Sequence, residues 1–286
     1  MSRSIYKILL LLYSALILSA CSPLQLLSAI ADDGHQSSVN QAYGPERRQE
    51  LTVYVPRNVE GNADVVIFYY GGRWQSGDKK QYAFVADALT AKGFIVVLPD
   101  YRLYPSVGWR DFIQDGASAY QWVYRNIARY HGNPKRIFVM GHSSGAHIAA
   151  MINVKESLLK QGIKRPCGFV GLAGPYDFLP IADADVQQVF SSATDLRNTQ
   201  PINYVSKGDP VMLLLHGKDD TTVKPGNATR LAERVKQFGD HVDLKLYDDL
   251  GHIGLLISLS STFRGYSPAL EDSVTFMRKV ECLAGL

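Results

Sequence analysis

The sequence carries little net charge for its length. In 286 residues, 30 Lys and Arg residues stand against 27 Asp and Glu residues, which leaves +3. Arg3 and Lys7 lie in a leader that we expect to be removed, so the mature chain keeps about +1. No run of like charges occurs, and no basic stripe suggests a nucleic-acid surface. We therefore expect no nucleic-acid partner.

Metal-binding patterns are missing as well. No two of the seven histidines have the spacing of a zinc protease, and no Cys/His cluster occurs. The chain also shows no internal repeat and no composition shift that marks a second domain. The remaining composition, with 46% hydrophobic and 20% charged residues, is that of a globular protein with a real core. One domain without a metal site is expected.

Residues 1–20 form a leader that differs from the rest of the chain. Arg3 and Lys7 precede the apolar run Ile8–Leu18, which has the length of a signal-peptide core and is too short to span a bilayer. The run ends in Leu18-Ser19-Ala20-Cys21, which resembles the lipobox of bacterial lipoproteins. That resemblance implies a lipid on Cys21 and an anchor in the outer membrane, on its periplasmic side, because Ser22 is not Asp. The alternative is an ordinary secretory leader with an incidental cysteine.

Beyond the leader, residues 21–42 have no periodicity and are predicted to be a flexible tether, followed by a folded domain at 43–286. Export to an oxidising compartment would leave Cys167 and Cys282 as candidates for one disulfide. The alternative, two unrelated buried thiols, stays open.

Within the domain, short apolar runs alternate with helical stretches, which is typical of βαβ units and a mainly parallel sheet. Several runs, such as Val65–Tyr70, are continuously apolar, as a strand buried on both faces requires. The predicted strands are Leu51–Val55, Val65–Tyr70, Phe94–Leu98, Arg136–Met140, Gly168–Leu172, Val211–His216 and Val242–Tyr247. The predicted helices are Gln81–Lys92, Asp111–Tyr130, Ser144–Gln161, Gly226–Phe238 and Pro268–Cys282.

Two segments break this alternation. Tyr176–Asp209 is rich in Asp, Ser and Pro, and His252–Ser267 separates the last predicted strand from the last helix. Both leave strands at their carboxyl ends, where open α/β sheets bind ligands. We therefore expect both segments to form walls of a pocket.

The most informative motif is Gly141-His142-Ser143-Ser144-Gly145. It follows an apolar strand and opens a helical run, which is the strand–turn–helix setting of a nucleophile elbow. The two glycines allow a sharp turn, and Ser143 is expected in a strained conformation with its hydroxyl raised. The motif predicts Ser143 as a nucleophile, against the alternative of a turn without chemistry.

A serine nucleophile needs a base that an acid orients, and in this arrangement they follow the serine along the chain in the order acid, then base. His252, after strand Val242–Tyr247, is the candidate base. Asp219 and Asp220 both follow strand Val211–His216, and their position leaves either possible as the acid. The other histidines are predicted to pack, to brace turns or to lie in the tether.

A third element follows strand Val65–Tyr70. The small residues of Gly71-Gly72-Arg73 allow backbone N–H groups to point at a developing oxyanion. We expect the N–H groups of Gly72 and Arg73, together with that of Ser144, to form an oxyanion hole. A simple turn at a strand end is the alternative.

Together these motifs resemble the esterase/lipase branch of the α/β-hydrolases, near hormone-sensitive-lipase-like, feruloyl-esterase-like and kynurenine-formamidase-like enzymes. The resemblance runs from Tyr43 to the C-terminus. The matching stretches are Tyr70-Gly71-Gly72-Arg73-Trp74 for the family's H-G-G-x-W, Asp100-Tyr101-Arg102-Leu103, the elbow, Gly174-Pro175-Tyr176-Asp177 and the G-x-x-D-x-x-V stretch Gly217–Val223. It implies a three-layer α/β/α fold with a small or absent cap, and it implies Asp220 as the acid. Tyr70 departs from the family's histidine, which generally braces the turn, so substrate preference is affected more than catalysis.

The expected activity is hydrolysis of a small-molecule carboxylic ester without metal or cofactor. The short segment Tyr176–Asp209, and Leu255 and Leu256 beside His252, suggest compact acyl groups. Two alternatives remain: an amidase, peptidase or acyltransferase with the same triad, and an envelope lipoprotein that binds a ligand without catalysis.

Overall fold

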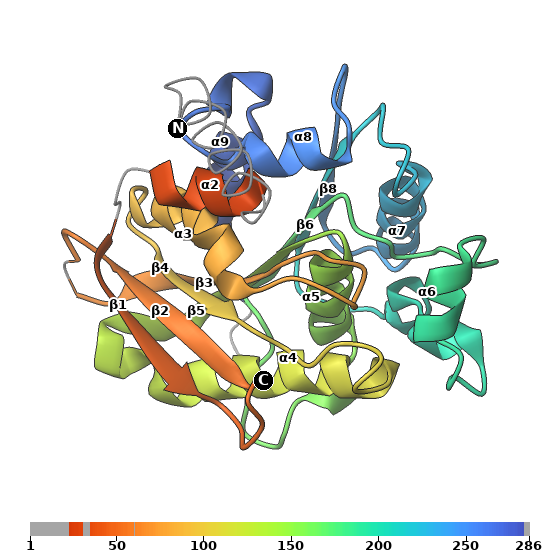
Figure 1. The fold of residues 1–286 in the computed structure, drawn as a ribbon, viewed down its shortest axis with the longest axis horizontal. Helices are drawn as coiled ribbons and strands as arrows, with labels where there is room; N and C mark the ends of the chain where they lie inside the picture. Colours follow the sequence, from red (N-terminus) through yellow and green to blue (C-terminus); the bar gives the residue numbers. More distant parts are fainter. Residues whose placement is uncertain (1–22, 31–34, 60, 283–286) are drawn as a thin grey trace, which may run out of the picture.

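The computed structural model describes residues 23–30, 35–59 and 61–282. In these ranges, eight strands form one sheet in the order β1-β2-β4-β3-β5-β6-β7-β8 (Figure 1). β2 pairs antiparallel with β1 and β4, and every other pairing is parallel. The strands are β1 (His35–Ala42), β2 (Glu50–Pro56), β3 (Ala63–Tyr69), β4 (Ile95–Pro99), β5 (Gly132–His142), β6 (Gly168–Leu172), β7 (Met212–Gly217) and β8 (Val242–Tyr247).

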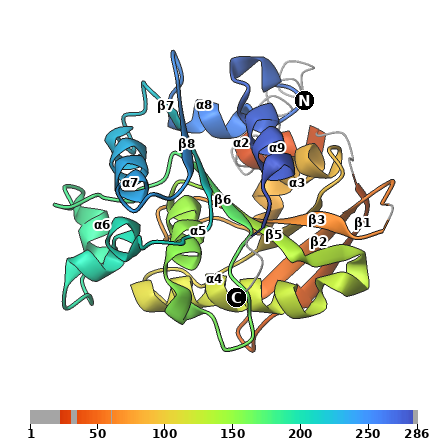
Figure 2. The same cartoon turned by 180° about the vertical axis from the view of Figure 1, so that it is seen from behind.

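Helices cover both faces of this sheet, which gives the three layers that the sequence predicts. α3 and α9 lie on one face, and α4 and α5 on the other (Figures 1 and 2). The α-helices are α2 (Pro23–Ile30), α3 (Ala83–Thr90), α4 (Trp109–Asn126), α5 (Ser144–Val154), α6 (Ala184–Val189), α7 (Gly226–Gln237), α8 (His252–Ile257) and α9 (Ala269–Lys279). The 3-10 helices are η1 (Lys79–Tyr82), η2 (Ile127–Tyr130), η3 (Glu156–Leu158), η4 (Leu196–Thr199), η5 (Pro201–Tyr204) and η6 (Arg264–Tyr266).

The central strands are buried on both faces, because helices pack above and below them. In β3, residues Val65 to Tyr69 are all buried, and all five residues of β4, β6 and most of β5 are buried as well. Continuous apolar sequence is what such strands need. β8 lies at the sheet edge, where Val242 is its one buried residue, and its sequence includes the charged residues Asp243 and Lys245.

The predicted tether at 21–42 is wrong for its described part. Residues 35–42 form β1, which pairs with β2 in a register that places Val39 opposite Val53. α2 lies against η1, where Ser28 Oγ donates to the Gln81 carbonyl at 2.9 Å. β1 is a largely exposed, polar strand at the sheet edge, and backbone hydrogen bonds hold it to β2. Its sequence therefore shows no apolar pattern that would predict a strand. The leader and Cys21 lie outside the described residues.

A disulfide joins Cys167, just before β6, to Cys282, just after α9, with Cα atoms 4.7 Å apart. Of the two alternatives that the sequence left open, the structure contains the bonded pair. Arg136 of β5 also contacts this C-terminal segment, through a hydrogen bond from Nη1 to the Val280 carbonyl at 2.9 Å. Within the described ranges, none of the helices has the length and apolar character needed to cross a membrane.

Candidate active site

Ser143 lies in the sharp turn between β5 and α5. Its φ of 55° and ψ of −126° place a non-glycine residue in a strained backbone conformation. The flanking glycines are required by close backbone approach: a Cβ on Gly145 would collide with the Tyr69 carbonyl oxygen, and one on Gly141 would lie 2.5 Å from the Gly145 carbonyl carbon. The expected elbow geometry is therefore present. The N-terminus of α5 lies directly behind Ser143 and favours negative charge there.

Asp220 and His252 meet at the carboxyl end of the sheet. His252 Nδ1 lies 2.7 Å from Asp220 Oδ2, although 32 residues separate them in sequence. Asp220 Oδ1 accepts backbone hydrogen bonds from Thr222 and Val223, each at 2.9 Å. Asp219 is exposed, whereas Asp220 is buried. Of the two carboxylates after β7, the structure brings Asp220 to the imidazole.

A second histidine also contacts Asp220. His216, fully buried in β7, has Nε2 3.2 Å from Asp220 Oδ2 and 2.8 Å from the Val223 carbonyl oxygen. Burial alone raises the pKa of the Asp220 carboxyl, but the hydrogen bonds from His216 and His252 outweigh it and hold that pKa below its usual range. His216 is one of the histidines that the sequence predicts to brace a turn. Nothing in the sequence indicates its contact with Asp220.

Ser143 and His252 come together through His142. The structure has no hydrogen bond between Ser143 and the His252 ring, but His142 Nε2 lies 3.1 Å from the His252 carbonyl oxygen. The His142 and His252 ring centroids are 4.6 Å apart. Catalytic hydrogen bonds are often long in a ligand-free enzyme and tighten when substrate binds.

The predicted oxyanion turn lies beside the elbow. Gly72 has φ 138° and Arg73 has φ 57°, so the chain reverses sharply after Tyr70. A Cβ on Gly71 would lie 3.0 Å from Ser143 Cβ, which shows how closely the turn packs on the serine. Within the described residues, the backbone N–H groups of Gly72, Arg73 and Ser144 have no protein acceptor. They are therefore available to an oxyanion.

Two ion pairs connect this turn and its surroundings to the segment after β6. The Arg73 guanidinium donates to Asp183 Oδ1 at 2.6 Å, and Asp183 also caps α6 by accepting from the Asp185 and Val186 amides. Arg230 of α7 pairs with Asp177. Both pairs are partly exposed and add little stability. Their effect is to tie the predicted oxyanion turn and α7 to the segment after β6.

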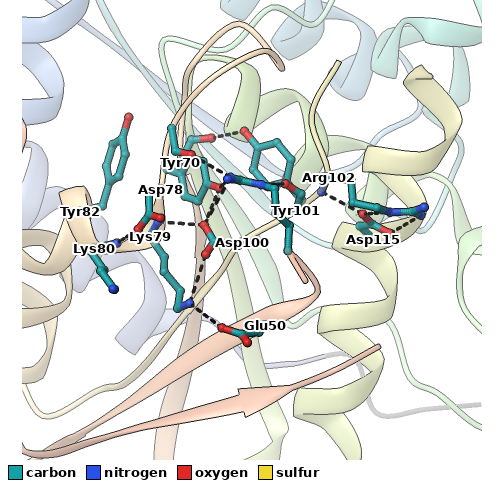
Figure 3. A network of polar contacts seen from close by, with 12 residues as sticks. Glu50, Tyr70, Asp78, Lys79, Lys80, Tyr82, Asp100, Tyr101, Arg102 and Asp115 are labelled. Atoms are coloured by element: carbon teal, nitrogen blue, oxygen red, sulfur yellow. Dashed lines mark hydrogen bonds and ion pairs between the residues drawn. The ribbon is translucent and has the colours of Figure 1, made fainter. Parts of the chain in front are cut away.

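Tyr70, the residue that departs from the H-G-G-x-W pattern, belongs to a polar network (Figure 3). Its hydroxyl donates to Asp100 Oδ1 at 2.7 Å and accepts from Arg48 Nη2 at 2.7 Å. Asp100 also accepts from the backbone amide and Nζ of Lys79, and the Tyr101 hydroxyl donates to the Tyr70 carbonyl at 2.8 Å. The tyrosine ring is stacked against Tyr82 and Tyr101. Tyr70 thus fixes the strand end from which the oxyanion turn starts.

A cavity of about 500 Å³ opens at Ser143. The segment after β6 supplies much of its apolar wall, as predicted, through residues such as Phe178, Leu179 and Ile181. The complete lining is Arg73, Trp74, Ser143, Ser144, Pro175, Asp177, Phe178, Leu179, Pro180, Ile181, Ala182, Asp183, Val186, Thr221, Thr222, Val223, Lys224, Asn227 and Arg230.

The second predicted wall, His252–Ser267, is wrong, because none of its residues lines the cavity. Leu255 and Leu256, which we expected to narrow the site, are 0% and 1% exposed and belong to the core. The short helix α8 turns its leucines inward, away from the cavity. Residues Thr221 to Lys224, after the acid, take the place of that wall.

The sequence is similar to a known protein family and to proteins with esterase names. Residues 51–235 match the family model described as BD-FAE. The probable isoprenylcysteine alpha-carbonyl methylesterase ICMEL1 of Arabidopsis thaliana is 29% identical over 259 residues, which cover 82% of this chain and 54% of that protein. The probable carboxylic ester hydrolase LipM of Mycobacterium tuberculosis is 25% identical over 236 residues, covering 75% of this chain and 55% of LipM. The chain thus spans about half the length of these curated relatives.

Solved structures show the same fold. A truncated carbohydrate esterase from gut microbiota has a TM-score of 0.76 at 23% identity and covers 87% of this chain and 98% of its own. The butyrate-bound esterase Est2 of Thermogutta terrifontis has a TM-score of 0.72 at 20% identity, with 88% and 97% covered. The family model covers residues 51–235, which is well over half of the sequence. This chain is therefore an α/β-hydrolase and belongs to the BD-FAE family.

Proposed function

We propose that this protein is a carboxylic ester hydrolase. The observation that carries the proposal is the strained Ser143 at the strand–helix junction, which opens onto a cavity of about 500 Å³. The curated relatives that carry esterase names support it, as does family membership. A backbone held at φ 55° is costly, and such strain concentrates at functional sites.

In the mechanism, Ser143 Oγ attacks the acyl carbon while His252 Nε2 takes the hydroxyl proton. Asp220 accepts the Nδ1–H of His252, which leaves Nε2 unprotonated and able to accept the serine proton, and it stabilises the imidazolium that forms. The N–H groups of Gly72, Arg73 and Ser144 receive the negative charge on the acyl oxygen. His252 then delivers its proton to the leaving alcohol, and water releases the acid from the acyl-enzyme.

The substrate class is a compact acyl ester. The cavity is bounded by Trp74 and by the apolar residues that follow β6, and the segment between β6 and β7 contains only short helices. The related Thermogutta terrifontis esterase holds butyrate in its structure. A panel of esters and amides that share one acyl group tests the activity: esters should be cleaved at least 100-fold faster, and faster amide cleavage would overturn the proposal.

We also propose that the chain is attached to a bacterial membrane by a lipid on Cys21, with the outer membrane as the destination. The motive is the sequence Leu18-Ser19-Ala20-Cys21 after an apolar run. Expression of the full chain in a Gram-negative host, followed by fractionation and mass measurement, tests this. A lipidated protein in the outer-membrane fraction is expected, and a Cys21→Ala variant should lack the lipid. A soluble mature protein without lipid would contradict the proposal.

A further inference from the structure

His142 is a buried histidine that the mechanism above does not use. It is the last residue of β5 and directly precedes Ser143. The residue is only 2% exposed. Its Nε2 lies 3.1 Å from the carbonyl oxygen of His252, and its ring lies against the His252 ring with planes inclined by 44°. His142 therefore contacts both the backbone and the imidazole of the proposed base.

The surroundings of His142 fix its protonation state. Nε2 has an acceptor, the His252 carbonyl, whereas the buried Nδ1 has no hydrogen-bond partner within the described part of the chain. Burial, and next the proximity of His252, hold the pKa of His142 well below its usual value. Asp220 and His216 are the other ionisable groups that act on it. His142 is therefore neutral, and its single N–H is on Nε2 and is donated to His252.

His142 is also enclosed from the opposite side. A Cβ on Gly71 would lie 3.1 Å from His142 Nδ1, so the glycine of the oxyanion turn packs directly on this ring. The ring is held between the oxyanion turn and the first residue of α8. α8 has only six residues, and the residue before it, Gly251, has no side chain to cap it.

We propose that His142 is a positioning residue for the ester hydrolysis proposed above. Its Nε2–H holds the backbone of His252 at the start of α8, and its uncharged ring forms one wall of the space in which the imidazole turns between Asp220 and Ser143. His142 does not touch the substrate and transfers no proton. It acts by keeping the base in reach of the serine, and misplacement of a catalytic group by 1 Å costs about 100-fold in rate.

The test compares two substitutions of equal length. In His142→Gln the side-chain amide keeps a donor near the place of Nε2, whereas His142→Met fills the same volume without one. We expect His142→Met to lower kcat by about 10- to 100-fold with KM within about 2-fold, and His142→Gln to recover most of that loss. The ascending limb of the pH–rate profile should persist in His142→Gln with a one-proton slope, because His252 alone is the base.

His147→Met is the matched control for stability. His147 is also buried and donates Nε2–H to a backbone carbonyl, that of Thr199, at 2.7 Å. Among the residues that the structure describes, its Nδ1 has no hydrogen-bond partner, and no contact joins it to His252. We expect a comparable loss of melting temperature in the two Met variants and at least a 10-fold higher kcat in His147→Met. Equal kcat in His142→Gln and His142→Met, or loss of the ascending limb in His142→Gln, would overturn the positioning role. Failure of the wild-type protein to cleave esters or to react with a fluorophosphonate would instead overturn the proposed function.

Discussion

His252 Nδ1 lies 2.7 Å from Asp220 Oδ2, and this contact joins the turn after β7 to the first residue of α8. A carboxylate on Nδ1 selects the tautomer in which Nε2 carries the lone pair. His216, on the other side of the same carboxylate, and the Thr222 and Val223 amides leave Asp220 little freedom to move. Asp220 is thus held in place on the Nδ1 side of His252.

The first prediction separates the two neighbouring aspartates. Asp220→Asn should lower kcat by about four orders of magnitude, the loss seen in a serine protease whose imidazole takes the wrong tautomer. Asp219→Asn should stay within about 3-fold of the wild type, because Asp219 is exposed and its backbone N–H, not its side chain, donates to the Leu250 carbonyl. Steady-state kinetics on one ester decide between them. A dead Asp219→Asn beside an active Asp220→Asn would reverse the assignment.

The second prediction concerns stability against pH. Burial lowers the pKa of His147 from 6.5 to about 4, so between these values the unfolded chain binds a proton that the folded chain does not. The contribution of His147 to the free energy of unfolding is fully present above pH 6.5. It is lost as the pH falls towards 4, which lowers the free energy of unfolding by up to about 3 kcal/mol. Urea unfolding from pH 7 to 4.5 should show this slope. His147→Met should make the slope shallower, with a part remaining because the pKa of the buried His142 is lowered as well. His131→Asn, at an exposed turn position, should keep the wild-type slope. Equal slopes in all three proteins would refute the interpretation.

The third prediction concerns the disulfide between Cys167 and Cys282, which closes a loop of 115 residues. The chain-entropy relation assigns about 4 to 5 kcal/mol to a loop of this size. Reduction should therefore lower the melting temperature by several degrees or more, and a Cys167→Ala/Cys282→Ala variant should melt at the reduced temperature with or without reductant. Because Cys167 precedes β6, at the end of the sheet away from Ser143, kcat well below the melting temperature should change less than 2-fold. An unchanged melting temperature would contradict the prediction.

The fourth prediction concerns acyl length. With a cavity of about 500 Å³ walled by Phe178, Leu179 and Ile181, nitrophenyl esters should be cleaved fastest as acetates to butyrates and at least 10-fold more slowly as decanoates. Ile181→Ala removes part of the apolar wall, which enlarges the cavity, and should shift the optimum to longer chains. Arg264→Ala, at an exposed position in η6, is the control and should keep the wild-type optimum. Highest activity on decanoate in the wild type would contradict the compact site.

Most of the fold could be read from the sequence, because the central strands are buried on both faces and appear as apolar runs. Val65 to Tyr69 and Met212 to Leu215 are examples. β1 could not be predicted in this way. Its residues 37–40 are exposed, and the strand is held to β2 by backbone hydrogen bonds that leave no mark on the side-chain pattern.

Some features of the candidate site could be predicted from the sequence, and others could not. Ser143 and the turn after Tyr70 were visible because a strained turn needs glycine at fixed positions, and the pairing of Asp220 with His252 was implied by family resemblance. The contacts of His142 and His216 were invisible, because they depend on the distance between strand ends that sequence spacing does not encode. Leu255 and Leu256 were misplaced for the same reason: adjacency to His252 in the chain does not decide which way a short helix faces.

The central claim is that Ser143 is the nucleophile of an esterase, and fluorophosphonate labelling with mass mapping tests it most directly. Wild-type protein should be labelled once, on the peptide that contains Ser143, with loss of ester hydrolysis in proportion to labelling. Ser143→Ala should neither label nor hydrolyse esters above about one part in a thousand of the wild-type kcat, while its melting temperature stays close to that of the wild type. Labelling of another serine, or hydrolysis by Ser143→Ala at a rate near that of the wild type, would contradict the account.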